Sequence, residues 1–168
     1  MTRIIDFYSG TEGDDQGRML ADILAQDDRW LENVHDYIQW VFPNREAGQV
    51  TPWAPLISAQ DETEFRENEA LRNRLMDSFC RMLAFYGMRI SEGRITRADN
   101  WDDRKHNWFI RDTHNNLRIT RILKCLVALG LENEARHFFT ALKDLVESEL
   151  DCGISQTSIR YWTEAIES

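Results

Sequence analysis

The sequence contains few residues that break helices or cross-link a chain. It has three prolines, all within 43–55, and three cysteines, which cannot all pair and show no metal-ligand spacing. The longest hydrophobic run, 125–131, is far shorter than the ~20 residues that cross a bilayer. The N-terminus also lacks the apolar core of a signal peptide. These absences predict a soluble, cytoplasmic protein with reduced thiols and no membrane span.

Positive charge is scarce as well. Twenty Lys and Arg residues stand against 29 Asp and Glu residues, which gives a net charge of −9. Because nucleic-acid-binding domains are normally basic, we expect no nucleic-acid partner. The basic residues gather in 87–130, which carries nine of them against five acids. Arginine outnumbers lysine 17 to 3, and guanidinium groups bind carboxylates and phosphates with two hydrogen bonds. This favours either surface ion pairs or an arginine-rich anion site.

Apolar residues recur at helical spacing over nearly the whole chain. The predicted helices cover 16–26, 28–42, 58–67, 68–86, 100–110, 115–129, 132–150 and 155–166. No sustained two-residue alternation and no Asn-Gly or Asp-Gly turn predicts a strand. We therefore expect an all-α fold, a single compact domain over 1–168 with about six to eight helices around one core. Residues 131–168 should form a C-terminal helical hairpin.

The segment 113–124 (THNNLRITRILK) combines basic residues with a helical pattern. His114, Arg118 and Arg121 lie at i, i+4 and i+7, on the side opposite the apolar residues. Arg111 extends this line if the helix begins earlier. The arrangement predicts an anion site, although an arginine–carboxylate network that joins this helix to an acidic neighbour would use the same residues.

The position of the helix start decides between these interpretations. With Asn115 as the N-cap, Arg118 lies in the first turn, where the helix dipole disfavours a cation by roughly 0.3–1 kcal/mol. Free backbone N–H groups and two guanidiniums would then bind an anion together. With Thr113 as the cap, Arg118 moves inward and the argument weakens. Cys125 on the same helix is either an activated thiolate or a small buried residue.

The segment 31–43 (LENVHDYIQWVFP) places polar groups among aromatic ones. His35 and Gln39 are four residues apart and would share one helix face. Buried polar groups need partners, so this pair is either a satisfied core pair or the polar floor of an apolar pocket. The surrounding aromatic residues include Trp30, Tyr37 and Trp40.

Two Glu-x-x-His pairs raise a metal-site alternative. The first pair is Glu32 with His35, and the second is Glu134 with His137. Both are expected on helices, and acids within 58–72 could complete a di-metal site. We treat this site as an outside candidate and expect neither a cofactor nor a catalytic residue.

Three segments resemble the conserved region of the opioid growth factor receptor family. Residues 31–43 are similar to its LExxHxYIQWLFP signature, residues 81–87 (RMLAFYG) to its ML-x-FYG block, and residues 114–124 to its HNNLRITRILKSL block, with Cys125 in place of Ser. The resemblance covers about 7–130 in the expected order. It implies a receptor for an opioid peptide, met-enkephalin, associated with membranes and the nuclear envelope. It also implies the ability to hold a small ligand, and it supplies no catalytic residues.

Together these observations predict a non-enzymatic domain that binds a small anionic molecule or a peptide carboxylate. The site should lie where helix 28–42 meets the start of helix 115–129. Its expected ligand-binding residues are His35, Gln39, Trp40, Tyr86, Arg111, His114, Asn115, Arg118 and Arg121. The alternatives are a protein–protein interaction scaffold without a pocket and an uncharacterised enzyme, metal-dependent or not. The sequence leaves the oligomeric state open.

Overall fold

The computed structural model describes residues 1–48 and 51–168, which form two compact units. The first unit contains Met1–Ser78 and Ala128–Gly130, and the second contains Phe79–Val127 and Leu131–Ser168. Two long helices, α6 (Glu69–Phe85) and α8 (His114–Ala128), contribute residues to both units.

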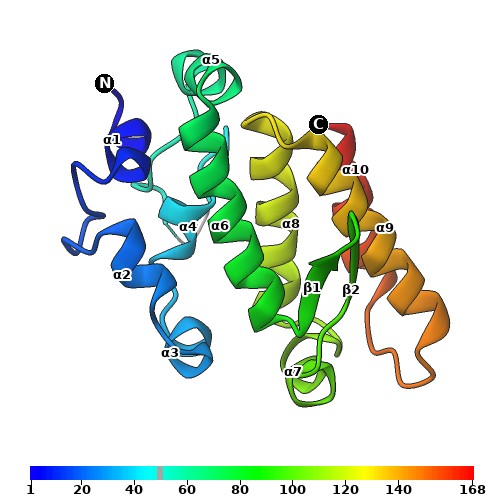
Figure 1. Ribbon diagram of the computed structural model, residues 1–168. Coiled ribbons are helices and arrows are strands. Elements are labelled where there is room, and N and C mark those ends of the chain that lie inside the picture. The colour runs from blue at the N-terminus through cyan, green and yellow to red at the C-terminus, as the bar shows by residue number, and fades with distance from the viewer. Residues whose placement is uncertain (49–50) are drawn as a thin grey trace. The chain divides into compact units, whose positions relative to one another are not determined.

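The first unit is built from short helices and the start of α6 (Figure 1). The short helices are α1 (Arg3–Ser9), α2 (Leu20–Leu24), α3 (Asp28–Asn33), α4 (Ile38–Val41) and α5 (Ala59–Glu67). Side-chain oxygens of Thr2, Asp27 and Ser58 cap α1, α3 and α5, because each accepts a backbone N–H of the first turn. Tyr8 of α1 is fully buried, stacks edge-on against Phe65 of α5 at 5.2 Å, and donates its hydroxyl to the carbonyl of Val41. This aromatic contact lies in the core of the first unit.

The second unit contains α7 (Trp101–Trp108), most of α8, α9 (Glu132–Ser148) and α10 (Gln156–Glu167). It also contains the antiparallel strands β1 (Met88–Ser91) and β2 (Arg94–Arg97). Helix α10 packs along α9, and β2 packs against α9 (Figure 1). Buried tryptophans tie the elements together: Trp162 Nε1 donates to the Asn116 carbonyl at 3.1 Å, and Trp108 Nε1 donates to the Tyr86 carbonyl at 2.9 Å.

The prediction of an all-α fold with six to eight helices is wrong. The described residues form ten helices and a two-stranded sheet. The hairpin lies between the predicted helices 68–86 and 100–110, where no strand was expected. Its strands have four residues each, too short to show an alternation, and its turn uses Glu92 and Gly93 in place of Asn-Gly or Asp-Gly. Both turn residues have positive φ, 50° and 74°, which is the geometry a two-residue hairpin turn requires.

The helix count is higher because one predicted helix is divided and another was not expected. Residues 28–42 form α3 and α4, with 34–37 outside any helix. Val34 is extended, and Tyr37 folds back so that its hydroxyl donates to the Leu31 carbonyl at 3.0 Å. This tertiary hydrogen bond satisfies a carbonyl near the end of α3 and overrides the helical spacing. Helix α1 was not predicted, and 16–26 shrinks to α2.

The other predicted helices are present with small shifts at their ends. Asn68 caps α6, since its Oδ1 accepts the backbone N–H groups of Ala70 and Leu71 at 3.0 and 3.3 Å. Gly87 ends α6 with a positive φ of 80°. Ser155 caps α10. At these three ends a capping side chain or a glycine therefore coincides with the predicted helix boundary.

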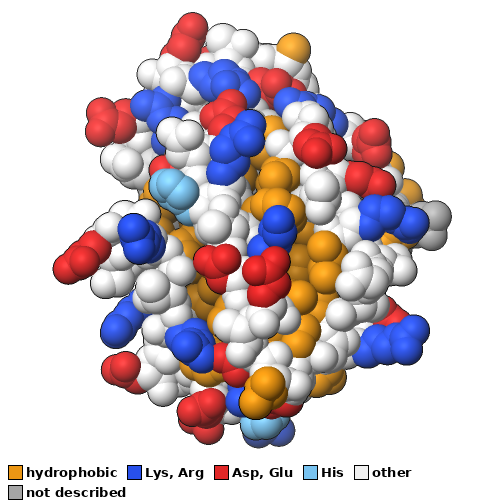
Figure 2. Space-filling model, turned by 90° about the vertical axis from the view of Figure 1, so that its right-hand side faces the viewer, with side chains coloured by type: hydrophobic (Ala, Val, Ile, Leu, Met, Phe, Trp, Pro, Cys, Tyr) orange, Lys and Arg blue, Asp and Glu red, His pale blue; other side chains and the backbone are white. Residues whose placement is uncertain are grey.

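The surface on the side of α9 and α10 mixes hydrophobic and charged side chains. Figure 2 shows bands of hydrophobic side chains on this face, crossed by acidic and basic ones. Large apolar residues of the second unit that are exposed are Ile90, Ile110, Leu117, Leu150 and Tyr161. Among the described residues, no helix combines the length and apolar character needed to cross a membrane.

Candidate functional site

The predicted ligand-binding residues of the first unit have different surroundings. His35 lies between α3 and α4 and is exposed, whereas Gln39 and Trp40 lie on α4 and are buried. Because the helix is interrupted, the prediction that His35 and Gln39 share one helix face is wrong. Gln39 and Trp40 do line a common pocket, which is described below.

The predicted residues of the second unit lie on and near α8. Arg111 is exposed and pairs with Asp112, and His114 is exposed at the helix start. Tyr86, Asn115 and Arg118 are buried. Arg118 is 5% exposed, and its Nη1 donates to Asn115 Oδ1 at 3.4 Å.

The helix start follows the alternative with Thr113 at the N-cap position. Helix α8 begins at His114, and the Asn116 side chain accepts the Thr113 N–H at 3.1 Å. Arg118 is therefore the fifth helical residue, beyond the first turn, and the dipole argument for an anion there weakens.

Burial shapes the chemistry of the next turn of α8. Burial lowers the pKa of Arg121, and the nearby Cys125 thiol offsets part of that shift. Burial raises the pKa of Cys125 well above its ordinary value, against the opposite effect of Arg121. Cys125 is fully buried and keeps its proton, so the structure favours a small core residue over an activated thiolate.

The two groups of predicted ligand residues belong to different units. Gln39 and Trp40 are part of the first unit, and Arg118 and Arg121 are part of the second. A single site that joins all four side chains stays a prediction.

The residues of the metal-site alternative are divided between the two units. Glu32 and His35 belong to the first unit, while Glu134 and His137 belong to the second. His137 lies on α9 and is exposed, and His35 is exposed as well. Over residues 1–48 and 51–168, no three His, Cys, Asp or Glu side chains are grouped so that they could hold a metal ion. Glu-x-x-His spacing can place two side chains on one helix face but does not by itself bring further ligands to them, so the site of Glu32, His35, Glu134 and His137 stays a prediction.

The first unit contains a small pocket, which we call the acidic pocket. It has a volume of about 100 Å³ and is formed by three separate stretches, 14–18, 36–40 and 51–54. Its charged lining residues are Asp14, Asp15, Arg18 and Asp36, and its aromatic ones are Trp40 and Trp53.

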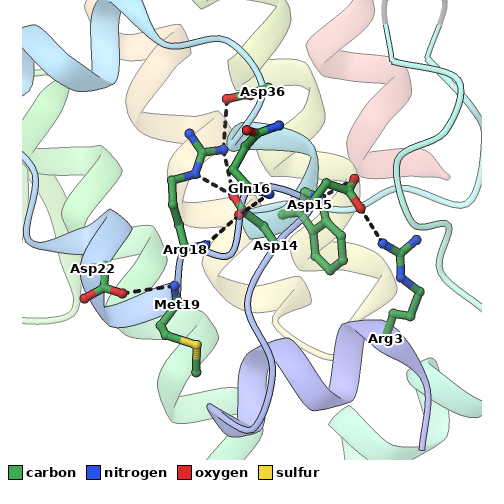
Figure 3. A network of polar contacts seen from close by, with 9 residues as sticks. Arg3, Asp14, Asp15, Gln16, Arg18, Met19, Asp22 and Asp36 are labelled. Carbon is green, nitrogen blue, oxygen red and sulfur yellow. Dashed lines mark hydrogen bonds and ion pairs between the residues drawn. The ribbon is translucent and has the colours of Figure 1, made fainter.

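Asp14 organises one wall of the acidic pocket (Figure 3). This aspartate is buried, and its Oδ1 accepts the backbone N–H groups of Gln16 and Arg18, both at 2.9 Å. Its Oδ2 accepts Arg18 Nε at 2.8 Å. An Asp side chain that accepts backbone N–H groups two and four residues later stabilises the turn locally. Gly17, with φ 75°, supplies the left-handed residue of this turn.

Arg18 joins this turn to the stretch between α3 and α4. Its Nη2 lies 2.7 Å from Asp14 Oδ2 and 2.9 Å from Asp36 Oδ1. Burial lowers the pKa of Arg18, but the hydrogen bonds and charges of Asp14 and Asp36 raise it by more, so the guanidinium stays charged. Its positive charge is thus shared between two carboxylates of the pocket.

Trp40 is fixed in a similar way. Its Nε1 donates to Asp15 Oδ2 at 3.1 Å, and the Arg3 guanidinium lies 4.7 Å from the centre of its ring. Arg3 also pairs with Asp15 at 2.5 Å (Figure 3). The indole wall is therefore held in place by a hydrogen bond, an ion pair and a cation–π contact.

Two lining residues of the acidic pocket have groups that a ligand could use. Gln39 is only 8% exposed, and its Oε1 has no hydrogen-bond partner among the described residues. A buried acceptor without a partner costs about 1–3 kcal/mol, which a donor from a bound molecule would recover. Trp53, in contrast, is 68% exposed and offers an indole at the rim.

A larger hollow of about 560 Å³, which we call the groove, lies in the same unit. It is formed by the end of α1, by α2 and by α6. Its lining combines the apolar residues Leu20 and Leu24 with Arg74 and Asp77. Arg18 lines the acidic pocket and the adjacent Met19 lines the groove, so the two hollows have consecutive residues in their walls.

Gln39 and Trp40 were predicted as members of another site, one with the start of helix 115–129, and Asp14, Arg18 and Asp36 were not predicted. The Asp-to-Gly turn signal at 14–17 was visible in the sequence and could have predicted a turn held by a side chain. The pairing of Arg18 with Asp36 could not be predicted, because it depends on tertiary packing across 18 residues.

The comparisons with known proteins agree with one another. The family model described as "Opioid growth factor receptor (OGFr) conserved region" matches residues 5–168. The opioid growth factor receptor of Homo sapiens is 40% identical over 145 residues, which cover 81% of this chain and 20% of that protein. The receptor of Rattus norvegicus is 37% identical over 158 residues, 89% of this chain and 27% of that protein.

A relative with a similar name also matches the chain. The opioid growth factor receptor-like protein 1 of Mus musculus is 34% identical over 140 residues, 81% of this chain and 30% of that protein. The chain thus spans less than a third of the length of these curated relatives. No solved structure matches it.

Proposed function

Since the chain belongs to the opioid growth factor receptor family, we propose that it is a non-enzymatic module that binds a short peptide. Its relatives in Homo sapiens and Rattus norvegicus are named as receptors, which implies a ligand. The peptide binds to the first unit, with its main part in the groove and one side chain in the acidic pocket.

The sizes of the two hollows support this division. The groove, at about 560 Å³, falls within the roughly 300–1,000 Å³ typical of ligand sites. The acidic pocket, at about 100 Å³, equals the liquid volume of only a few water molecules, at roughly 30 Å³ each. It therefore suits the end of one side chain.

The observation that carries the proposal is the buried Gln39 acceptor. Gln39 Oε1 lacks a partner among the described residues, in a pocket whose other walls are held by the Asp14 and Asp15 networks. A preorganised wall with one acceptor left over suits a ligand that donates a hydrogen bond.

The anionic end of the ligand is a separate part of the proposal. A peptide carboxylate at Arg118 and Arg121 rests on the sequence pattern of α8 and on no contact in the structure. Since these two arginines belong to the second unit, this expectation is separate from the peptide site of the first unit and is tested on its own.

An array of short peptides that includes met-enkephalin tests the proposal. Binders are confirmed by calorimetry and by the rise in melting temperature. We expect Trp53→Ala to weaken the tightest binder about tenfold, because an indole at the rim of a pocket contributes about 1 kcal/mol or more. Trp53 is largely exposed, so its loss should leave the fold intact.

Leu150→Ala is the matched control. Leu150 is fully exposed and belongs to the second unit, so its variant should bind like the wild type. Absence of binding across the array, or equal weakening by both variants, would contradict the proposal and favour an interaction scaffold.

A further inference from the structure

We infer that the acidic pocket receives a cationic side-chain end of the bound peptide, an ammonium or a guanidinium. The inference rests on the proposed function, because it names the chemistry of the group that enters the pocket. It follows from the charges that line the pocket, from its unused acceptors and from the charge of the whole first unit.

The lining of the pocket is negative. Three carboxylates line it, those of Asp14, Asp15 and Asp36, with one lining cation, Arg18, while Asp15 pairs with Arg3 beside the pocket. Arg18 is already engaged by Asp14 at 2.7 Å and by Asp36 at 2.9 Å, and Asp14 receives two backbone N–H groups as well. An anion entering this pocket would approach carboxylates and find its cation occupied, whereas a cation would gain by entering.

Two acceptors in the wall of the pocket have hydrogen-bonding capacity left. Gln39 Oε1 has no partner among the described residues and is nine-tenths buried. The Asp36 side chain is 51% exposed and binds Arg18 through Oδ1, so its carboxylate keeps the capacity to accept further hydrogen bonds. An ammonium has three donors and a guanidinium has five, so either group can use both acceptors.

Indoles provide the remaining contact. Guanidinium groups already lie over two indoles of this unit, Arg3 over Trp40 at 4.7 Å and Arg18 over Trp30 at 5.4 Å. Trp53 lies at the rim of the pocket and is mostly exposed. A cation that enters past Trp53 would pass within reach of an indole face, which attracts it.

The electrostatic field of the first unit also favours a cation. This unit carries sixteen carboxylates and seven Lys or Arg residues, while the second unit carries thirteen of each. The whole net charge of −9 therefore belongs to the unit that contains the pocket. Such a field raises the local concentration of cationic ligands and speeds their association.

Calorimetry with a matched series of blocked peptides tests the inference. The peptides are acetyl-Ala-Leu-X-Leu-Ala-amide, where X is Lys, Arg, Gln, norleucine or Glu, so that only the central side chain differs in charge. We expect the Lys or Arg peptide to bind at least about tenfold more tightly than the norleucine peptide, with the Glu peptide weakest. The difference should shrink as NaCl is added. Equal binding of the Lys, Arg and norleucine peptides would overturn the inference.

Asp36→Asn is the diagnostic variant. It should reduce the preference for Lys or Arg over norleucine to about threefold or less, while the norleucine peptide binds as before. Glu12→Gln is the control, since Glu12 is an exposed acid of the same unit outside the pocket, and it removes the same charge. If Glu12→Gln reduces the preference as much as Asp36→Asn, the selectivity comes from the general field and the pocket assignment is wrong.

A second probe separates this inference from the proposed function. Titration with n-butylammonium chloride, against sodium chloride at equal ionic strength, should shift the NMR signal of the Trp53 indole in the wild type and not in Asp36→Asn. If this shift occurs while no peptide binds, the cation pocket stands and the peptide function fails. If peptides bind without charge preference and n-butylammonium causes no shift, the function stands and the cation pocket is wrong.

Discussion

The side chain of Arg118 shows how burial changes the expected effect of one substitution. Arg118 is almost fully buried on α8 and hydrogen-bonds Asn115, whereas Arg111, seven residues earlier, is exposed. We predict that Arg118→Ala lowers the free energy of unfolding by about 1–3 kcal/mol, because it leaves buried polar groups without a partner. Arg111→Ala should change it by no more than about 0.5 kcal/mol.

Urea denaturation of both variants measures this difference. A further titration with phosphate examines the predicted anion role, since an anion site at Arg118 would make the wild type, and not Arg118→Ala, more stable in phosphate. Equal stability of the two variants in buffer would show that burial of Arg118 contributes little.

At the residue scale, the sequence predicted chemistry better than geometry. Gln39 and Trp40 were predicted as the polar and aromatic parts of a site shared with helix 115–129, which stays a prediction, and in the structure they line the acidic pocket of the first unit. His35 was placed beside Gln39 only because a continuous helix was assumed, and the break at 34–37 separates them. The network of Asp14 and Arg18 was missed because its partners meet only after folding.

The β1–β2 hairpin is the element that the sequence patterns missed most clearly. Two glycines, one before β1 and one in the turn, allow a test of how its position is fixed. Gly87 precedes β1 and Gly93 forms the turn, both with positive φ. A Cβ at Gly87 would lie 2.8 Å from Trp101 Cα, while a Cβ at Gly93 would have nothing within 4 Å. The two positions therefore share the backbone cost and differ in the steric one.

We predict that Gly93→Ala lowers the free energy of unfolding by about 1–2 kcal/mol, the cost of a left-handed Ala. Gly87→Ala should lower it by a further 1–3 kcal/mol, roughly, because the backbone of α7 cannot yield without disturbing buried Trp101. Thermal and urea unfolding of the two variants give the comparison. Similar losses in both would mean that α7 shifts at little cost.

Helices whose ends carry a capping residue or a glycine were predictable, and elements that depend on tertiary contacts were not. Asn68, Gly87 and Ser155 mark helix ends in the sequence and do so in the structure. The hairpin depends on cross-strand pairing of four residues and on its packing against α9, and neither leaves a local pattern. The end of α3 depends on the hydroxyl of Tyr37 in the same way.

At the scale of the molecule, the net negative charge belongs to one of the two units. A count of charges along the sequence does not show this division. The basic stretch 87–130 was noticed as a local excess of positive charge. It belongs almost wholly to the second unit, whose thirteen basic residues equal its thirteen acids. The first unit keeps the full −9, so its partners and its stability should both depend on charge.

Repulsion within the first unit predicts an unusual response to salt. The Debye length falls from about 30 Å at 0.01 M to about 10 Å at 0.1 M, so salt screens repulsion between distant carboxylates first. Short pairs such as Arg18–Asp14 at 2.7 Å and Arg45–Glu62 at 2.6 Å are screened less. We therefore predict that NaCl in this range raises the melting temperature by roughly 2–4 °C, which corresponds to about 1 kcal/mol for a chain of this size.

Matched charge neutralisations show where this response arises. Glu12→Gln with Glu64→Gln removes two exposed carboxylates from the first unit, and Asp144→Asn with Glu167→Gln removes two from the second. Scanning calorimetry should show a weaker salt dependence for the first pair and an unchanged one for the second. A melting temperature that falls with salt in the wild type would mean that attractive ion pairs outweigh the repulsion among the sixteen carboxylates of the first unit. In that case the excess of negative charge would be compensated within the fold, and the preference of its pocket for cations would have to come from Asp36 and Gln39 alone.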